Sequence, residues 1–328
     1  MKRLSRRHML QLSSALLTAT TTPGSAQPML PNKALRILVG YAAGGGSELM
    51  ARAIAPQLER RTGRRISVQN KPSGADIAAG KLFLEDLEQG LFVAFLPTTT
   101  LPVAATGWPF PFDSQSQIVP LTSAGPFHVA LAAAPNTHLK SFTDYVAWVK
   151  ERPSERARLG TSATDAYLRT YALMIGRAMG VSIEIVPHRG SGALVKALSD
   201  GSVPAGIGSV TTLLEHNFGG EVKILMTSGA KRGWVLRDVP TVVELGYPGL
   251  ELQDWYGFFA SSSSPASVIE AWNRQLQQTL HDREVEPALA QLGCDVETCT
   301  LAEAATRLAA NFRAWKERME SVGIKTGD

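Results

Sequence analysis

The sequence is poor in the features that mark metalloproteins and membrane proteins. It has two cysteines, Cys294 and Cys299, and no histidine near them has the spacing of a zinc site. After the N-terminal segment, no apolar run approaches the roughly 20 residues that a membrane-spanning helix needs. We therefore expect no metal and no membrane span. Whether the two cysteines pair in an oxidising compartment stays open.

The N-terminal segment has the composition of an export signal. Basic residues at its start are followed by a modest apolar stretch, Met9 to Ala19, and by small residues that end at Ala26. We predict that residues 1–26 are a signal peptide, that cleavage follows Ala26, and that the protein is periplasmic. Ser5 to Leu10 resembles a twin-arginine signal, and the general secretory route stays an alternative.

The chain lacks a surplus of positive charge once this signal is set aside. The full sequence has 33 lysines and arginines against 29 acids, and four of those bases lie in the signal, which leaves 29 against 29. The pI of about 9.1 therefore gives no support for nucleic-acid binding. The remaining length, about 300 residues, suggests two domains.

Strand and helix patterns alternate along most of the chain. Predicted strands at Leu35–Val39, Ser67–Gln69 and Leu91–Leu96 are separated by helical segments, a βαβαβ order that requires parallel strands. A second α/β unit follows, with strands at Arg158–Gly160 and Ile183–Val186. Further strands are expected at Ile118–Ser123, His128–Ala133 and Lys223–Thr227. The sequence predicts an α/β fold with two Rossmann-like domains.

The turn after the first strand, "GYAAGGGSEL", is rich in glycine. A nucleotide P-loop would place a lysine after the glycines, and here Ser47 is followed by Glu48. The dinucleotide fingerprint also needs spaced glycines, which this turn does not have. Bare backbone at a helix N-terminus still favours an anion, because unpaired N–H groups and the positive end of the helix dipole meet there. The turn therefore predicts a cradle for a carboxylate.

Three more strand-to-helix turns share this character. They are "NKPSGAD", "LGTSATD" and "PHRGSGA", and together the four turns describe a cleft between two lobes. Asp76 and Asp165 stand at helix starts, where an acid can cap the helix or receive an amino group. No Gly-x-Ser-x-Gly elbow, His-Glu-x-x-His or Ser-x-x-Lys motif is present, and the histidines are well separated. We therefore predict that the protein is not an enzyme.

The order of these motifs resembles the receptor proteins of tripartite tricarboxylate transporters, the Bug family. The resemblance runs from about Pro31 to Gly323 and rests on the first glycine turn and "NKPSGAD", on Val186–Ser191, on Asp238–Thr241, and on Trp255-Tyr256-Gly257. The chain departs from the family pattern at Ala43 and Glu48, and it loses two acids at Pro204 and Gly208. The ligand preference of relatives is therefore not expected to transfer unchanged.

The resemblance implies a two-lobed periplasmic binding protein fold of type II. Lobe 1 would comprise residues 27–125 and 230–328, and lobe 2 residues 126–229. The chain would bend near Ala124–Val129 and Met226–Lys231. The cleft residues carried over from the family motifs are Tyr41, Ala43, Gly44, Gly45, Ser47, Ser73, Gly74, Asp76, Thr98, Thr99, Ser162, Thr164, His188, Gly190 and Ser191.

The implied function is capture of a small carboxylate by lobe closure and its delivery to the membrane subunits of a transporter. No cofactor is implied, and a monomer is expected. The few arginines in the turns, with Arg189 as the exception, suggest one or two carboxylates rather than three. Two other functions stay open, a periplasmic carboxylate sensor that feeds a signalling partner and an exported enzyme of similar architecture.

Overall fold

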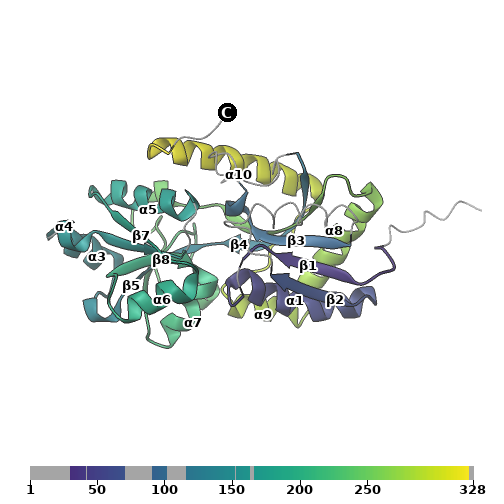
Figure 1. Ribbon diagram of the computed structural model, residues 1–328, viewed down its shortest axis with the longest axis horizontal. Coiled ribbons are helices and arrows are strands. Elements are labelled where there is room, and N and C mark those ends of the chain that lie inside the picture. The colour runs from purple at the N-terminus through teal and green to yellow at the C-terminus, as the bar shows by residue number, and fades with distance from the viewer. Residues whose placement is uncertain are drawn as a thin grey trace, which may run out of the picture.

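The protein is built on two five-stranded sheets that lie in the two halves of an elongated molecule (Figure 1). The computed structural model describes residues 30–41, 43–70, 91–101, 116–151, 153–162 and 166–324. The first sheet has, in spatial order, β2 (Ile66–Asn70), β1 (Leu35–Val39), β3 (Phe92–Pro97), β10 (Asp254–Ser261) and β4 (Ile118–Phe127). The second has β7 (Glu184–Pro187), β6 (Arg158–Thr161), β8 (Ala205–Ser209), β5 (Val129–Ala133) and β9 (Lys223–Thr227).

The two sheets share one topology. In each, three parallel strands form one side, β2-β1-β3 in the first sheet and β7-β6-β8 in the second. The fourth position is held by an antiparallel strand that has just crossed from the other half, β10 in the first sheet and β5 in the second. The predicted α/β fold with two Rossmann-like units is confirmed by this arrangement.

Helices of the first half cover its sheet, and the first of them follows the glycine turn directly. Residues of β1 and β3 are almost all buried, which is typical of central parallel strands covered on both faces. The helices of this half are α1 (Gly46–Thr62), α8 (Ala266–Leu280), α9 (Val285–Gln291) and α10 (Leu301–Ser321), with the short 3-10 turn η1 (Thr98–Thr100). Thr300 caps α10 in a reciprocal capping box with Glu303.

The second half carries the remaining helices. These are α3 (Phe142–Glu151), α4 (Pro153–Arg156), α5 (Ala166–Met179), α6 (Ser191–Ser199) and α7 (Val210–Phe218), with the 3-10 turns η3 (Pro135–Thr137), η4 (Trp234–Leu236) and η5 (Pro248–Leu250). Sequence patterns did not predict α7, α9 or β10. Residues 254–261 are buried on both faces, so β10 lacks the polar–apolar alternation that marks a strand in the sequence.

The chain crosses between the halves next to His128, where β4 ends at Phe127 and β5 begins at Val129. Beside this crossing, the Val129 N–H donates to Ser228 Oγ at 2.9 Å and the Ser228 N–H donates to the Val129 carbonyl at 2.8 Å. After Thr227 the chain stays against the second sheet, since Thr227 bridges Thr241, and it re-enters the first sheet at β10. The division into lobes at residues 125 and 230 stays a proposal.

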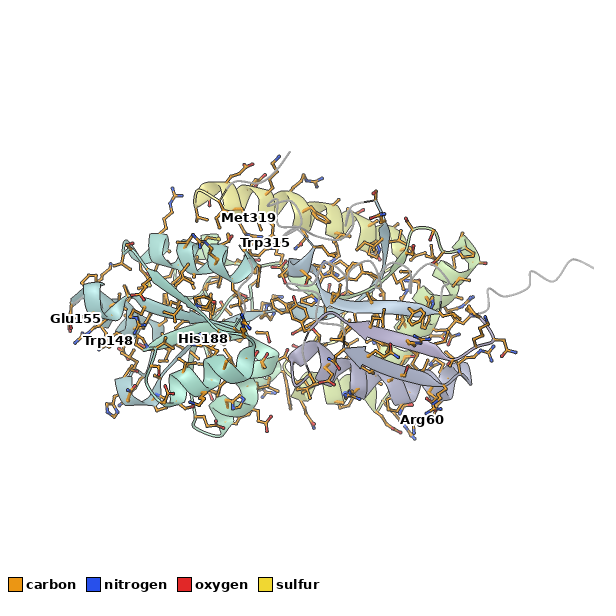
Figure 2. All side chains as sticks on the ribbon, viewed as in Figure 1. Arg60, Trp148, Glu155, His188, Trp315 and Met319 are labelled. Carbon is orange, nitrogen blue, oxygen red and sulfur yellow. The ribbon has the colours of Figure 1, made fainter. Side chains whose placement is uncertain are left out.

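Helix α10 lies across both halves of the molecule (Figure 1). Its inner face carries Trp315 and Met319, which are buried (Figure 2). The Trp315 ring packs edge-on against Tyr167 of α5, with ring centroids 4.6 Å apart. Near the end of α10, Arg177 Nη1 donates to the Ser321 carbonyl at 2.6 Å. The C-terminal helix is therefore a third connection between the halves.

Candidate functional site

A cleft of about 280 Å³ lies where the two sheets face each other. It sits at the carboxyl ends of the parallel strands β1, β3, β6, β7 and β8, the place where open α/β sheets bind ligands. Its lining residues are Tyr41, Ala43, Gly44, Gly45, Gly46, Ser47, Pro97, Thr99, Phe127, Ser162, Tyr167, Leu168, Arg189, Gly190, Ser191, Gly192, Ala193, Ser209, Thr212 and Tyr256.

The first wall of the cleft is the glycine turn before α1. Gly44 has a φ of +84°, a left-handed conformation that glycine adopts without strain. The turn leads into α1 at Gly46, and the first N–H groups of this helix have no partner within it. Because Gly46 and Ser47 both line the cleft, this wall presents the positive end of a helix to whatever binds there.

Glu48 supports the glycine turn from behind and is not among the lining residues. Its Oε2 accepts the Gly44 N–H at 2.6 Å, and its Oε1 accepts two N–H groups of Arg52 at 2.8 and 2.6 Å. The Gly44 hydrogen bond, followed by the Arg52 guanidinium, lowers the pKa of this carboxyl below its usual value. The acid that departs from the family pattern therefore holds the turn in shape.

The opposite wall comes from the second half of the molecule. Gly190, with a φ of +92°, leads into α6 at Ser191, so the first turn of this helix also faces the cleft. The start of α7 contributes Thr212 and its cap Ser209, whose Oγ accepts the Thr212 N–H at 3.3 Å. Among the described lining residues, Arg189 carries the one charged side chain, and none is acidic. This wall therefore also favours an anion.

Three aromatic residues form the floor of the cleft. Phe127 packs edge-on against both Tyr256 and Tyr167, with ring centroids 5.1 and 6.0 Å apart. The hydroxyl of Tyr256 lies 3.0 Å from the hydroxyl of Thr211, and burial raises the pKa of Tyr256. We call Phe127, Tyr167 and Tyr256 the aromatic floor.

The two halves touch at one side of the cleft. A Cβ placed on Gly46 would stand 2.7 Å from Cβ of Thr211 and 3.3 Å from the hydroxyl of Tyr256. Residue 46 therefore has no room for a side chain while α1 and α7 approach each other this closely. Thr211, at the start of α7, thus meets both α1 and β10 of the first half.

Most of the sequence-predicted site residues that the structure describes come together in this cleft. They are Tyr41, Ala43, Gly44, Gly45, Ser47, Thr99, Ser162, Gly190 and Ser191. Ser73, Gly74, Asp76 and Thr164 lie outside the described residues. That any of these residues contacts a ligand stays a prediction.

Two predicted residues are not brought to the cleft. Thr98 is fully buried, and its Oγ1 accepts the Trp255 N–H at 3.1 Å, which turns this side chain toward the core. His188 packs with Cε1 beside Gly160, on the second sheet, and is not among the lining residues (Figure 2). In both cases the next residue along the chain, Thr99 or Arg189, lines the cleft instead.

The floor and part of the second wall had little signal in the sequence. Phe127, Tyr167 and Leu168 had no local signal, and Tyr256 had only its place in the Trp-Tyr-Gly motif. Ser209 and Thr212 were missed because the start of α7 was not recognised. Within the described ranges, no group of three or more His, Cys, Asp or Glu side chains could hold a metal ion. The helices described there include none that is long and apolar enough to span a bilayer.

Comparisons with known proteins agree with this architecture. Residues 50–324 match the model of the tripartite tricarboxylate transporter family receptor. The chain is 26% identical to protein BugT of Bordetella pertussis over 97% of this chain and 99% of the relative. The solved structure of the periplasmic binding protein BugD superposes with a TM-score of 0.81 at 20% identity, over 90% of this chain and 99% of that one. 

A Rhodopseudomonas palustris protein solved with adipate also has a TM-score of 0.81, at 21% identity, over 90% of this chain and 98% of that one. At these identities the structural likeness shows the fold, which is the two-lobed fold of periplasmic binding proteins. The match of the family model covers most of the chain. The chain therefore belongs to the receptor family of the tripartite tricarboxylate transporters.

Proposed function

We propose that the protein is a periplasmic receptor that captures a small carboxylate in the cleft and delivers it to the membrane subunits of a tripartite tricarboxylate-type transporter. The observation that carries this proposal is the electrostatic character of the cleft. The first turns of α1 and α6 face it from opposite halves, Arg189 adds a positive charge, and no acid is found among its described lining residues.

Backbone N–H groups suit a carboxylate because each makes a charge-assisted hydrogen bond, which is stronger than a neutral one. The glycines at 44 to 46 let the anion approach closely, since no Cβ stands in the way. The adipate bound to the Rhodopseudomonas palustris relative supports a carboxylate in this chain as well. The cleft is formed by both halves, so a ligand in it would stabilise their closed arrangement.

Delivery requires a closed form that the membrane subunits distinguish from the open one. We propose that the chain bends at the crossing beside His128 and at the return into β10. Helix α10, which contacts α5, would follow this motion or limit it. The expected signal in residues 1–26 would place the receptor in the periplasm, where its cargo arrives.

A thermal-shift screen tests the binding step. The purified protein is unfolded and refolded to remove any carried-over ligand, then heated with mono-, di- and tricarboxylates, amino acids and nucleotides. Binding to the folded state must raise the unfolding midpoint by mass action. A carboxylate that raises the midpoint supports the proposal, and a response to nucleotides alone contradicts it.

A transport assay tests the delivery step. Cells without the gene are supplied with the radiolabelled acid that binds best, and uptake is compared with that of cells carrying the wild-type gene. We expect uptake to require the gene. Unchanged uptake by the deletion strain, together with tight binding of the acid, would favour a sensor that presents its closed form to a signalling partner.

A further inference from the structure

The aromatic floor limits what kind of carboxylate the cleft can hold. Phe127, Tyr167 and Tyr256 line the cleft and are 6%, 4% and 2% exposed. Tyr256 engages Thr211 through its hydroxyl, which leaves its ring to face the ligand as an apolar surface. Phe127 has no polar group at all. The floor therefore offers mainly ring surface, with the buried Tyr167 hydroxyl as one more polar group.

Apolar surface also continues up the sides of the cleft. Pro97, Leu168 and Ala193 also line it. Of the lining hydroxyl groups, those of Ser209 and Thr212 hydrogen bond to each other. The groups that most favour an anion lie at the two walls, at the starts of α1 and α6 and at Arg189, and the floor adds ring surface.

This separation disfavours a ligand that is charged over its whole length. A tricarboxylate such as citrate would press a carboxylate against the floor, and an ionised group that is buried without partners is strongly destabilised. An acid with one charged end and one apolar end can satisfy both regions together. Its carboxylate would meet the N–H groups of the walls, and its apolar body would lie on the floor.

The cleft also has room for such a body. Its volume is about 280 Å³, and a six-membered ring with one carboxylate fits within that space. A flat ring also suits the floor better than a flexible chain, because aromatic rings pack favourably edge-to-face and lose no rotamer freedom on binding.

Resting on the proposed function, we propose that the cargo is a carboxylic acid with a flat, apolar body of about one ring, oriented with the ring on Phe127 and Tyr256 and the carboxylate between the starts of α1 and α6. This is a narrower class than the carboxylates in general. It also gives the aromatic floor a role in selecting the ligand.

Isothermal titration of the refolded protein with matched acids tests this class. The acids are benzoate, cyclohexanecarboxylate, hexanoate, succinate and citrate, all at one pH and ionic strength. We expect benzoate to bind at least ten-fold more tightly than succinate and citrate, with hexanoate between them. If succinate or citrate binds more tightly than benzoate, the proposal of a flat-ring cargo is wrong, while the proposal of a carboxylate receptor is still supported. If none of these acids binds, the ring proposal fails, and the proposed function fails with it only if no carboxylate in the wider thermal-shift screen raises the midpoint either.

A pair of variants ties the preference to the floor. Phe127→Leu keeps an apolar side chain of similar length and removes the ring. It should lower the affinity for benzoate about five- to ten-fold and change any affinity for succinate less than two-fold. Phe142→Leu is the matched control, because Phe142 of α3 is also buried and packs on Tyr145 and Tyr247, away from the cleft. Equal losses for benzoate and succinate in Phe127→Leu would overturn the proposal, and the melting midpoint of each variant shows that it is folded.

Discussion

The hydroxyl of Tyr256 lies 3.0 Å from the hydroxyl of Thr211 and so joins the two halves of the protein beside the cleft. Tyr256 belongs to β10 of the first sheet, and Thr211 to the first turn of α7 in the second half. Gly46 of α1 lies against the same threonine. One residue of α7 therefore contacts two elements of the other half, and this junction should form or break when the lobes close or open.

Removing this hydrogen bond should weaken ligand binding. In Thr211→Val the shape is kept and the buried Tyr256 hydroxyl loses a partner, which costs about 1 kcal/mol, or about a five-fold loss of affinity, if the bond forms only in the closed state. Titration calorimetry of Thr211→Val, Tyr256→Phe and the double variant measures the coupling between the two residues. Additive losses would show that the two hydroxyls act independently.

A methyl group at residue 46 should hold the lobes apart. In Gly46→Ala, the new Cβ would meet Cβ of Thr211 at 2.7 Å, closer than carbon atoms can approach. We expect at least a ten-fold loss of affinity for the best acid, with little change in the melting midpoint of the ligand-free protein. Gly249→Ala is the control, because an added Cβ there meets nothing within 4 Å. Unchanged affinity in Gly46→Ala would mean that the close approach of α1 and α7 is not needed for binding.

The stability contributed by Glu48 should be lost in acid. The Gly44 N–H and the Arg52 guanidinium lower the pKa of Glu48 in the folded state, so the unfolded state binds more protons just below the usual value of 4.5. This contribution is therefore complete above that value and disappears as the pH falls through the lowered pKa. Melting curves between pH 3 and 7 should show the midpoint of Glu48→Gln approaching that of the wild type as the pH falls. A constant difference would contradict this role.

Asp254 should be a strong determinant of how α10 attaches to the first sheet. Its Oδ1 accepts from Asn311 Nδ2 at 2.6 Å and from Trp315 Nε1 at 2.8 Å, and all three side chains are buried. Asp254→Ala leaves both donors without this acceptor, so the free energy of unfolding should fall by about 2–4 kcal/mol in chemical denaturation.

Asp254→Asn separates the hydrogen bonds from the charge. The variant keeps an oxygen acceptor, so its free energy of unfolding should fall less than that of Asp254→Ala. Burial raises the pKa of Asp254 in the folded state, so its contribution to stability falls as the pH rises through that pKa. Asp254→Asn should therefore gain stability relative to the wild type at higher pH. Equal losses in the two variants at every pH would assign the effect to packing.

The two cysteines should be unreactive in the folded protein. Cys294 and Cys299 are both free and buried, and burial raises the pKa of the Cys294 thiol, which suppresses the reactive thiolate. A thiol reagent should therefore modify neither residue in the native protein and both after unfolding in denaturant. Rapid modification of the native protein, or the absence of any free thiol after unfolding, would contradict this arrangement.

Local patterns were enough to locate the elements whose signals are contained in a short stretch of chain. The run from β1 through the glycine turn into α1 was recognised because an apolar strand, three glycines and a helical pattern follow one another directly. Thr98 and Thr99 show the limit of such reasoning. Both follow β3 and both are buried, and only the packing of Asp254 and Trp255 turns Thr98 toward the core while Thr99 lines the cleft.

The aromatic floor could not be predicted, because its members come from distant parts of the chain. Phe127 ends β4, Tyr167 lies in α5, and Tyr256 lies in a strand inserted between β3 and β4. In the sequence, each of these residues looks like an ordinary core residue. The crossing of the chain between the two halves brings them together, and no local spacing encodes that. The region that selects the ligand is thus the part that the sequence reveals least.

A comparison of an acid with its own amide shows directly whether the cleft recognises the charge of a carboxylate. The acid that raises the melting midpoint most is titrated into the refolded protein, and its primary amide, which has the same shape and no charge, is titrated in parallel. If the starts of α1 and α6 hold a carboxylate, the acid should bind at least 100-fold more tightly than the amide. The Gly46→Ala variant should bind the acid more weakly than the wild type. Equal binding of acid and amide would contradict the account, because the cleft would then recognise shape without charge.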